Sequence, residues 1–141
     1  MIDVVARILF PFTVMTGLAL WARGYAAVGD GFSAGAVTGL GAALQYVALD
    51  LETARRRVAA RFAPAFLAVG LLIALVVVLA PLAWGEPPVT HFPRPGRELI
   101  HLGALDLHTA ALFDLGVALA VYGAITGTFD RLFPPFKGGQ S

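Results

Sequence analysis

Long apolar runs separated by short polar stretches dominate the chain, and this pattern predicts four membrane-spanning helices. Crossing a bilayer takes about 20 predominantly apolar residues, within a range of about 17 to 25. The third run has no charged side chain, whereas in the second run Gly and Ala replace many large aliphatic residues. We therefore expect an all-α membrane protein whose residues 1–141 form a single four-helix transmembrane domain, with helices at about 4–21, 32–49, 62–84 and 107–129.

Prolines and tryptophans refine these helices and the loops between them. Pro11 lies within the first run and should kink it, which membrane helices tolerate. Trp21 and Trp84 fall at the ends of runs, where aromatic residues form belts at the membrane surfaces. The stretch "GEPPVTHFPRPGRELIHLGALD" contains four prolines and cannot form a continuous helix. We expect it to be an extended outer loop between the third and fourth helices.

The distribution of basic residues predicts which way the helices cross the membrane. Four spans place both termini and the 50–61 loop on one side with seven of the ten Lys and Arg residues, and leave three on the other side. Basic residues concentrate in cytoplasmic loops, so we expect both termini in the cytoplasm. The stretch "ETARRRVAAR" is then a topological anchor, and binding of lipid headgroups or of a partner protein is the alternative.

Composition excludes several classes of protein. The chain is 58% hydrophobic and 13% charged, whereas soluble domains carry roughly 25% charged residues. A chain of 141 residues cannot bury that much apolar surface in one core, so we expect the lipid bilayer to surround it. Cysteine is absent, which excludes disulfides and thiolate catalysis, and no basic run interleaved with aromatics indicates nucleic-acid binding. We expect no enzymatic activity and no cofactor.

Glycines spaced four residues apart predict close helix packing. Gly31, Gly35 and Gly39 share a face of the second helix, and Gly123 and Gly127 repeat the spacing on the fourth. The surrounding "GDGFSAG" is similar to a dinucleotide-binding loop, but that loop requires a preceding strand, and here a helix is expected instead. Both helices look built to be surrounded by protein, so we infer that the chain belongs to a larger assembly.

Three histidines raise the alternative of a haem or metal site. His91, His101 and His108 cluster around the loop before the fourth helix. Cofactor and metal sites in helix bundles are built from side chains on facing helices, inside the bundle. We therefore interpret these residues as ordinary loop and interface histidines and expect no metal site.

One acidic residue, Asp114, lies inside the fourth apolar run, "LHTAALFDLGVALAVYGAITGTF". A charge at bilayer depth requires a partner or a wet cavity. Asp114 lies seven residues beyond Leu107, roughly 10 Å into the run and toward the outer face. Two roles stay open: a stop on an ion path, or a structural carboxylate that accepts hydrogen bonds. His108 is too far around the same helix to be its obvious partner, and Gln45 is a weaker candidate for a polar group within a span.

Two stretches of the chain resemble a known membrane family. "LFPFTVMTGLALWARGYAAVGDGFSAGAV" is similar to the start of the MnhB/MrpB family, in which the loop between the first two helices reads G-H-x-x-P-G-G-G-F-x-G-G. "LHTAALFDLGVALAVYG" is similar to the family stretch L-T-S-A-L-L-F-D-L-G-V-Y-L-x-V-x-G. The matching positions are Gly24, Gly29, Gly31, Phe32 and Gly35 in the first stretch and Ala110, Leu112, Phe113, Asp114, Leu115, Gly116, Val117, Val121 and Gly123 in the second.

The resemblance implies the B component of a multisubunit Mrp-type cation/proton antiporter, a non-catalytic multi-pass protein in the cell membrane. Larger components of such complexes carry Lys and Glu in broken helices, whereas the one lysine of this chain, Lys137, lies in the tail. The implied role is to pack the complex and to line a route for Na⁺ or another monovalent cation, with H⁺ moved by the complex. Tyr25 and Val28 depart from the family's His and Pro, and Asp30 and Ala34 replace glycines, so that Asp30 adds a carboxylate at the outer loop.

Two alternatives remain from the sequence. One is the equivalent component of an ion-pumping membrane-bound hydrogenase or complex I-like redox complex. The other is a free-standing four-helix membrane protein, such as a haem carrier or a small transporter. A member of a complex should co-purify with larger membrane proteins, whereas a free-standing protein should purify alone.

Overall fold

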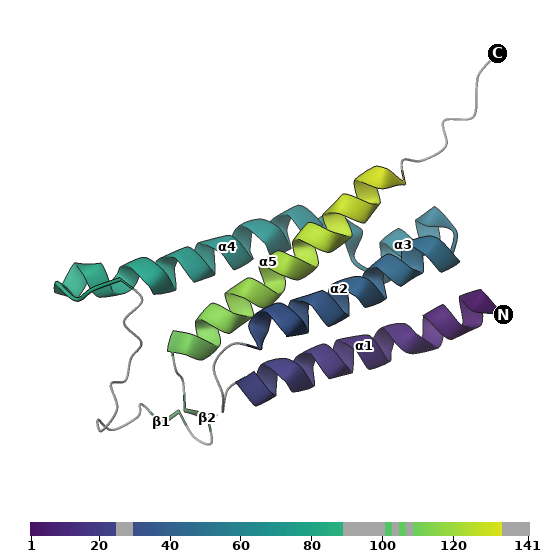
Figure 1. Ribbon diagram of the computed structural model, residues 1–141. Helices are drawn as coiled ribbons and strands as arrows, with labels where there is room; N and C mark the ends of the chain where they lie inside the picture. The colour runs from purple at the N-terminus through teal and green to yellow at the C-terminus, as the bar shows by residue number, and fades with distance from the viewer. Residues whose placement is uncertain (25–29, 89–100, 103–104, 107–108, 134–141) are drawn as a thin grey trace, which may run out of the picture.

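The fold consists mainly of long helices, as Figure 1 shows. The computed structural model describes residues 1–24, 30–88, 101–102, 105–106 and 109–133. Two short strands before the last helix pair antiparallel, with His101 opposite Asp106. In chain order the elements are α1 (Ile2–Gly24), α2 (Gly31–Ala48), α3 (Leu51–Arg57), η1 (Ala60–Phe62), α4 (Ala63–Leu79), η2 (Ala80–Trp84), β1 (His101–Leu102), β2 (Leu105–Asp106) and α5 (Thr109–Leu132), where η marks a 3₁₀ helix.

The prediction of a helical membrane protein is confirmed. Three helical stretches, Ile2–Arg23, Ala60–Trp84 and Thr109–Leu132, are long and apolar enough to cross a membrane. The helix expected at 32–49 is present as α2, but it is not among the stretches of the described residues that are long and apolar enough to cross a membrane. Most of the expected outer loop, residues 89–100, lies outside the described residues.

Proline shapes the helix that was expected to run through residues 62–84. The α-helix α4 ends at Leu79, and the 3₁₀ helix η2 continues the chain to Trp84. Pro81 lies in η2, and proline disrupts an α-helix because it lacks an N–H and its ring clashes with the preceding turn. Pro11, by contrast, lies inside α1, which continues on both sides of it.

The segment between α2 and α4 is partly helical, which differs from the loop expected at residues 50–61. Asp50 caps the short helix α3, because its carboxylate accepts the backbone N–H of Thr53 at 2.9 Å. This hydrogen bond lowers the pKa of Asp50. The chain then turns at Ala59, whose φ of 51° is left-handed and unfavourable for a residue with a Cβ. An Asp directly before a helix-forming run is an N-cap signal that predicts such a start.

The four long helices form an open row rather than a closed bundle. In Figure 1, α1, α2, α5 and α4 lie side by side in that order, with α1 and α4 running in one direction and α2 and α5 in the other. Large apolar side chains on the two outer helices are therefore uncovered, and Phe12 and Leu72 are 60% and 59% exposed. Soluble monomers rarely expose apolar surface on this scale, so lipid and other membrane proteins are the natural cover for these helices.

Glycines determine how closely neighbouring helices in the row approach. A Cβ added to Gly35 would lie 2.6 Å from the carbonyl oxygen of Ala118, and one added to Gly123 would lie 2.5 Å from the amide nitrogen of Leu67. Helices in lipid associate through close van der Waals contact of this kind. The expected packing glycines Gly31 and Gly39 are equally crowded, as are four that the sequence pattern did not single out: Gly17, Gly41, Gly70 and Gly116.

Gly127 differs from the other helical glycines. A Cβ added there would meet only the Cβ of Ala63, at 3.7 Å, which is an ordinary contact. The α4–α5 interface therefore opens at this level, although Gly127 lies only one turn beyond the tightly packed Gly123.

This contrast yields a matched pair of substitutions on one helix face. We expect Gly123→Ala to destabilise the protein by about 1–3 kcal/mol, because the added methyl group overpacks a backbone contact. Gly127→Ala should be neutral or slightly stabilising, since the space is available and Ala favours helix over Gly. Thermal unfolding in mild detergent, followed by circular dichroism, measures both. Equal stability of the two variants would contradict the packing argument.

Candidate functional site

Asp114, the acidic residue of the fourth apolar run, is buried near the beginning of α5. It lies in the second turn of α5 and is 4% exposed. The first residue of α2, Gly31, packs directly against its backbone, and a Cβ at Gly31 would clash with the Asp114 carbonyl oxygen and Cα. Asp114 also has a polar or electrostatic partner of its own.

Asp30 is brought to the same end of the molecule. It is the N-cap residue of α2 and is partly buried, and its backbone carbonyl accepts the N–H of Ala34 at 2.9 Å. Its carboxylate makes no capping hydrogen bond. Because Gly31 follows it directly and packs on Asp114, the fold gathers two acidic residues that are far apart in the sequence at one end of the α2–α5 pair.

Trp21 ties α1 to this end of the row. Its indole Nε1–H donates to the carbonyl oxygen of Ala111, in the first turn of α5, at 3.3 Å. Trp21 was expected at a membrane surface, and the contact fixes that end of α1 against the helix that carries Asp114. Three helices therefore meet around the acidic end.

Gln45, the second polar group expected within a span, faces α1 and not Asp114. It is fully buried, and its Nε2 donates to the carbonyl oxygens of Ala6 at 2.8 Å and Gly41 at 3.4 Å. Neither its Oε1 nor the Oγ1 of the fully buried Thr126 has a hydrogen-bond partner within the described residues. Gln45 lies near the opposite end of α2 from Gly31, so the structure separates it from Asp114.

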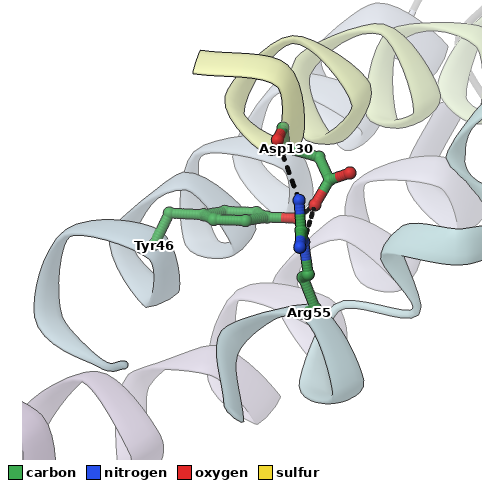
Figure 2. A network of polar contacts seen from close by, with 3 residues as sticks. All are labelled: Tyr46, Arg55 and Asp130. Atoms are coloured by element: carbon green, nitrogen blue, oxygen red, sulfur yellow. Dashed lines mark hydrogen bonds and ion pairs between the residues drawn. The ribbon is translucent and has the colours of Figure 1, made fainter. Parts of the chain in front are cut away.

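A polar network joins α2, α3 and α5 at the other end of the row, and the sequence did not predict it. Figure 2 shows Tyr46 of α2 and Arg55 of α3 converging on Asp130 of α5. The Tyr46 hydroxyl donates to Asp130 Oδ1 at 3.1 Å, and Arg55 Nε donates to the same oxygen at 2.5 Å. Arg55 Nη2 also donates to the Asp130 carbonyl oxygen at 3.3 Å. The bond to the Asp130 carboxylate raises the pKa of Arg55, which stays charged.

Aromatic packing accompanies this network. The ring of Tyr46 stacks on Phe133, with ring centres 6.2 Å apart, and lies 6.3 Å from the ring centre of Phe129. Arg55 and Asp130 are separated by 75 residues, so no local pattern could have paired them. Only the arrangement of α2, α3 and α5 brings these three side chains together.

The basic residues expected on one side of the membrane lie at this same end. Arg57 donates to the carbonyl oxygen of Arg7 at 3.0 Å, which joins α3 to α1, and Arg56 forms an exposed ion pair with Glu52. Arg61 and Arg131 line a pocket together with Asp130, whereas Lys137 lies outside the described residues. The structure therefore concentrates positive charge at one end of the row.

The histidine alternative falls mostly outside the described part of the chain. His91 and His108 are not among the described residues, and of His101 only the backbone, in β1, is described. Within the described residues, no group of three His, Cys, Asp or Glu side chains could hold a metal ion.

The chemistry available to the described residues is limited. Their buried polar or charged side chains are Gln45, Asp114 and Thr126, and Asp114 is the one that can carry charge. A buried carboxylate can hold a cation or a proton. Among the described residues, no second buried side chain that can carry charge accompanies it.

Comparison with known proteins identifies relatives over most of the chain. Residues 1–127 match the family described as "Domain related to MnhB subunit of Na+/H+ antiporter". The B subunit of the Na⁺/H⁺ antiporter of Bacillus subtilis (strain 168) is 36% identical over 104 residues, which cover 74% of this chain and 71% of that protein. The protein of the same name from Alkalihalophilus pseudofirmus is 32% identical over 120 residues, covering 85% of this chain and 79% of that protein.

A third relative is a much longer protein. The probable K⁺/H⁺ antiporter A/B subunit of Rhizobium meliloti (strain 1021) is 34% identical over 122 residues. The match covers 86% of this chain but only 12% of that protein. This chain is thus similar to a small part of a larger polypeptide.

The network on Asp130 can be tested by a double-mutant cycle. We expect Arg55→Gln and Asp130→Asn each to lower the free energy of unfolding by about 1 kcal/mol, with a coupling of about 0.5–1 kcal/mol, because a partly buried charged hydrogen bond is lost. Arg56→Gln is the control, since its exposed ion pair with Glu52 should contribute at most about 0.5 kcal/mol. Unfolding in detergent measures the two single variants, the double variant and the control, and additive effects at Arg55 and Asp130 would refute the coupling.

Proposed function

We propose that this chain, which belongs to the MnhB family, is a non-catalytic subunit of a multisubunit cation/proton antiporter in the cell membrane. The observation that carries the proposal is the family match over residues 1–127. That match includes α1, α2, α3 and α4 and most of α5, and so both ends of the helical row. Relatives named as Na⁺/H⁺ antiporter subunits favour this function over a redox complex or a free-standing carrier.

The proposed topology has four spans in one domain, with both termini in the cytoplasm. α2 lies between α1 and α5 and packs along both, so if its neighbours cross the bilayer, α2 crosses with them. Positive charge gathers at the end that holds Arg7, Arg57 and Arg131. Basic residues favour the cytoplasmic side, which supports a cytoplasmic position for that end and an outer position for Asp114.

The part played in transport follows from what the spans contain. No lysine occurs in any of the long helices, so proton translocation belongs to other subunits of the proposed complex. The open row leaves apolar helix faces for those subunits and for lipid to cover. We propose that Asp114, at the junction of α2 and α5, either contributes to the route of Na⁺ or another monovalent cation or holds that junction in place.

Co-purification tests the function itself. An affinity-tagged chain, extracted with a mild detergent, should carry antiporter-like subunits with it, and cells lacking the chain should lose cation-dependent proton exchange. Purification as a single small species, with exchange unchanged in its absence, would overturn the proposal.

Substitution of Asp114 separates its two roles. Asp114→Asn keeps the size of the side chain but removes its charge, whereas Asp114→Glu keeps the charge and moves it by about one methylene. A structural role predicts that the complex either tolerates Asn or is lost in both variants, because a mismatched polar group leaves partners unpaired. The tight burial against Gly31 leads us to expect this structural outcome. An intact Asn complex without exchange in membrane vesicles would instead establish an ion-path role.

Labelling from outside the cell tests the orientation. A single cysteine introduced at Pro88 should react with a membrane-impermeant maleimide in intact cells, since the chain has no other cysteine. A cysteine introduced at Glu52, in α3, should react only after the membrane is permeabilised. The reverse pattern would invert the proposed topology.

A further inference from the structure

A groove runs between α4 and α5 from the basic end of the molecule toward its centre. Its volume is about 610 Å³, and its apolar walls include Ala63, Leu67 and Leu71 of α4 with Ala124 and Gly127 of α5. Gly127 contributes no side chain, and a Cβ there would still leave ordinary contact with Ala63. Gly123 also lines the groove, so the groove runs alongside the tight helix contact at that residue.

Two arginines border the mouth of this groove. Arg61 and Arg131 both line it and are exposed, and neither takes part in an ion pair among the described residues. The guanidinium of Arg61 stacks over the ring of Phe62 at 4.4 Å, which leaves its N–H groups free to point elsewhere. Asp130 also lines the mouth, but its carboxylate already accepts hydrogen bonds from Arg55 and Tyr46. Among the described residues, the mouth therefore has two unpaired positive charges, whereas its one carboxylate is already paired.

The length of the groove matches one leaflet of a bilayer. Arg61 and Leu71 are ten residues apart along α4 and its preceding turn, which corresponds to roughly 15 Å at 1.5 Å per residue. The hydrocarbon core of a bilayer is about 30 Å thick, so one leaflet occupies about half of it. The groove has cations at one end and apolar walls over the length of one leaflet. It therefore complements a phospholipid, whose anionic headgroup would meet the cations and whose acyl chain would meet the apolar walls.

We propose that this groove binds one anionic phospholipid of the inner leaflet, with its phosphate between Arg61 and Arg131 and an acyl chain along Leu67 and Leu71. Arginine is well suited to the phosphate because its planar N–H fork binds oxygens in pairs. A helix of a neighbouring protein in the complex is the rival occupant, but it would need a face that continues through both leaflets. The proposal rests on the proposed orientation only for the choice of leaflet, and it does not depend on antiporter activity.

Native mass spectrometry of the full chain tests the proposal, with dioleoylphosphatidylglycerol as the anionic probe and dioleoylphosphatidylcholine as the neutral one. We expect one phosphatidylglycerol molecule to be retained in preference to phosphatidylcholine. A basic residue near an anionic lipid surface contributes about 1 kcal/mol, which corresponds to about a fivefold change in affinity. The double variant Arg61→Gln/Arg131→Gln should therefore bind phosphatidylglycerol roughly 25-fold more weakly.

Two further variants separate a built site from general charge attraction. Arg56→Gln removes the same charge at the same end, but Arg56 is paired with Glu52, so binding should change by less than about twofold. Gly127→Leu fills the groove and should weaken both lipids while Arg61 and Arg131 remain. Three results would each overturn the proposal. The first is equal binding of the two lipids by the wild-type chain, and the second is an equal loss of binding for Arg56→Gln and the double variant. The third is unchanged lipid binding by Gly127→Leu.

The rival occupant gives a different result in the purified complex. If an acidic helix of another protein in the complex fills the groove, Arg61→Gln/Arg131→Gln lowers the yield of the complex, and the isolated chain shows no lipid preference. That outcome would overturn the lipid site while leaving the antiporter function intact. Helix content by circular dichroism, unchanged in every variant, ensures that the comparison concerns folded protein.

Discussion

Direct contact between helix backbones is the constraint on which the rest of this structure depends. In lipid, apolar side chains gain little from leaving their surroundings, so neighbouring helices are held by close van der Waals contact and by polar groups. Glycines on α2, α4 and α5 permit that contact, and a methyl group at Gly35 or Gly123 would collide with the backbone of the next helix. The same contacts bring Gly31 onto Asp114 and so determine the surroundings of the buried carboxylate.

Close packing along a row has a consequence for assembly. Each inner helix packs along two neighbours, whereas α1 and α4 lie at the edges of the row and leave large apolar side chains such as Phe12 and Leu72 uncovered. Polar interactions lie mainly toward the two ends of the row, where Trp21 bonds to α5 and where Tyr46 and Arg55 converge on Asp130. A row that is firmly joined at its ends and apolar on its outer faces suits a protein that is placed among other membrane helices.

The two ends of the molecule differ in chemistry. One end holds Asp114 and Asp30 at the N-terminus of α2, and the other holds the arginines around Asp130. The Gln45 amide is not paired with either acidic residue, because its Nε2 donates a hydrogen bond to the backbone of α1. This polarity is the basis of the orientation that we propose. The buried Asp114 lies where the first residue of α2, Gly31, packs against its backbone.

The sequence by itself determined the helical membrane class, the approximate positions of the four long helices and the family, because apolar run length, proline placement and the motif around Asp114 are local properties of the chain. It also contained the N-cap signal at Asp50 that marks the start of α3, although residues 50–61 were expected to form a loop. The tertiary structure alone decided the open row, the network on Asp130 and the difference between the crowded Gly123 and the open Gly127. These features depend on which helices are neighbours and on how each helix is shifted along its axis relative to the next. Such contacts join residues many positions apart, and periodicity along one helix contains no information about them.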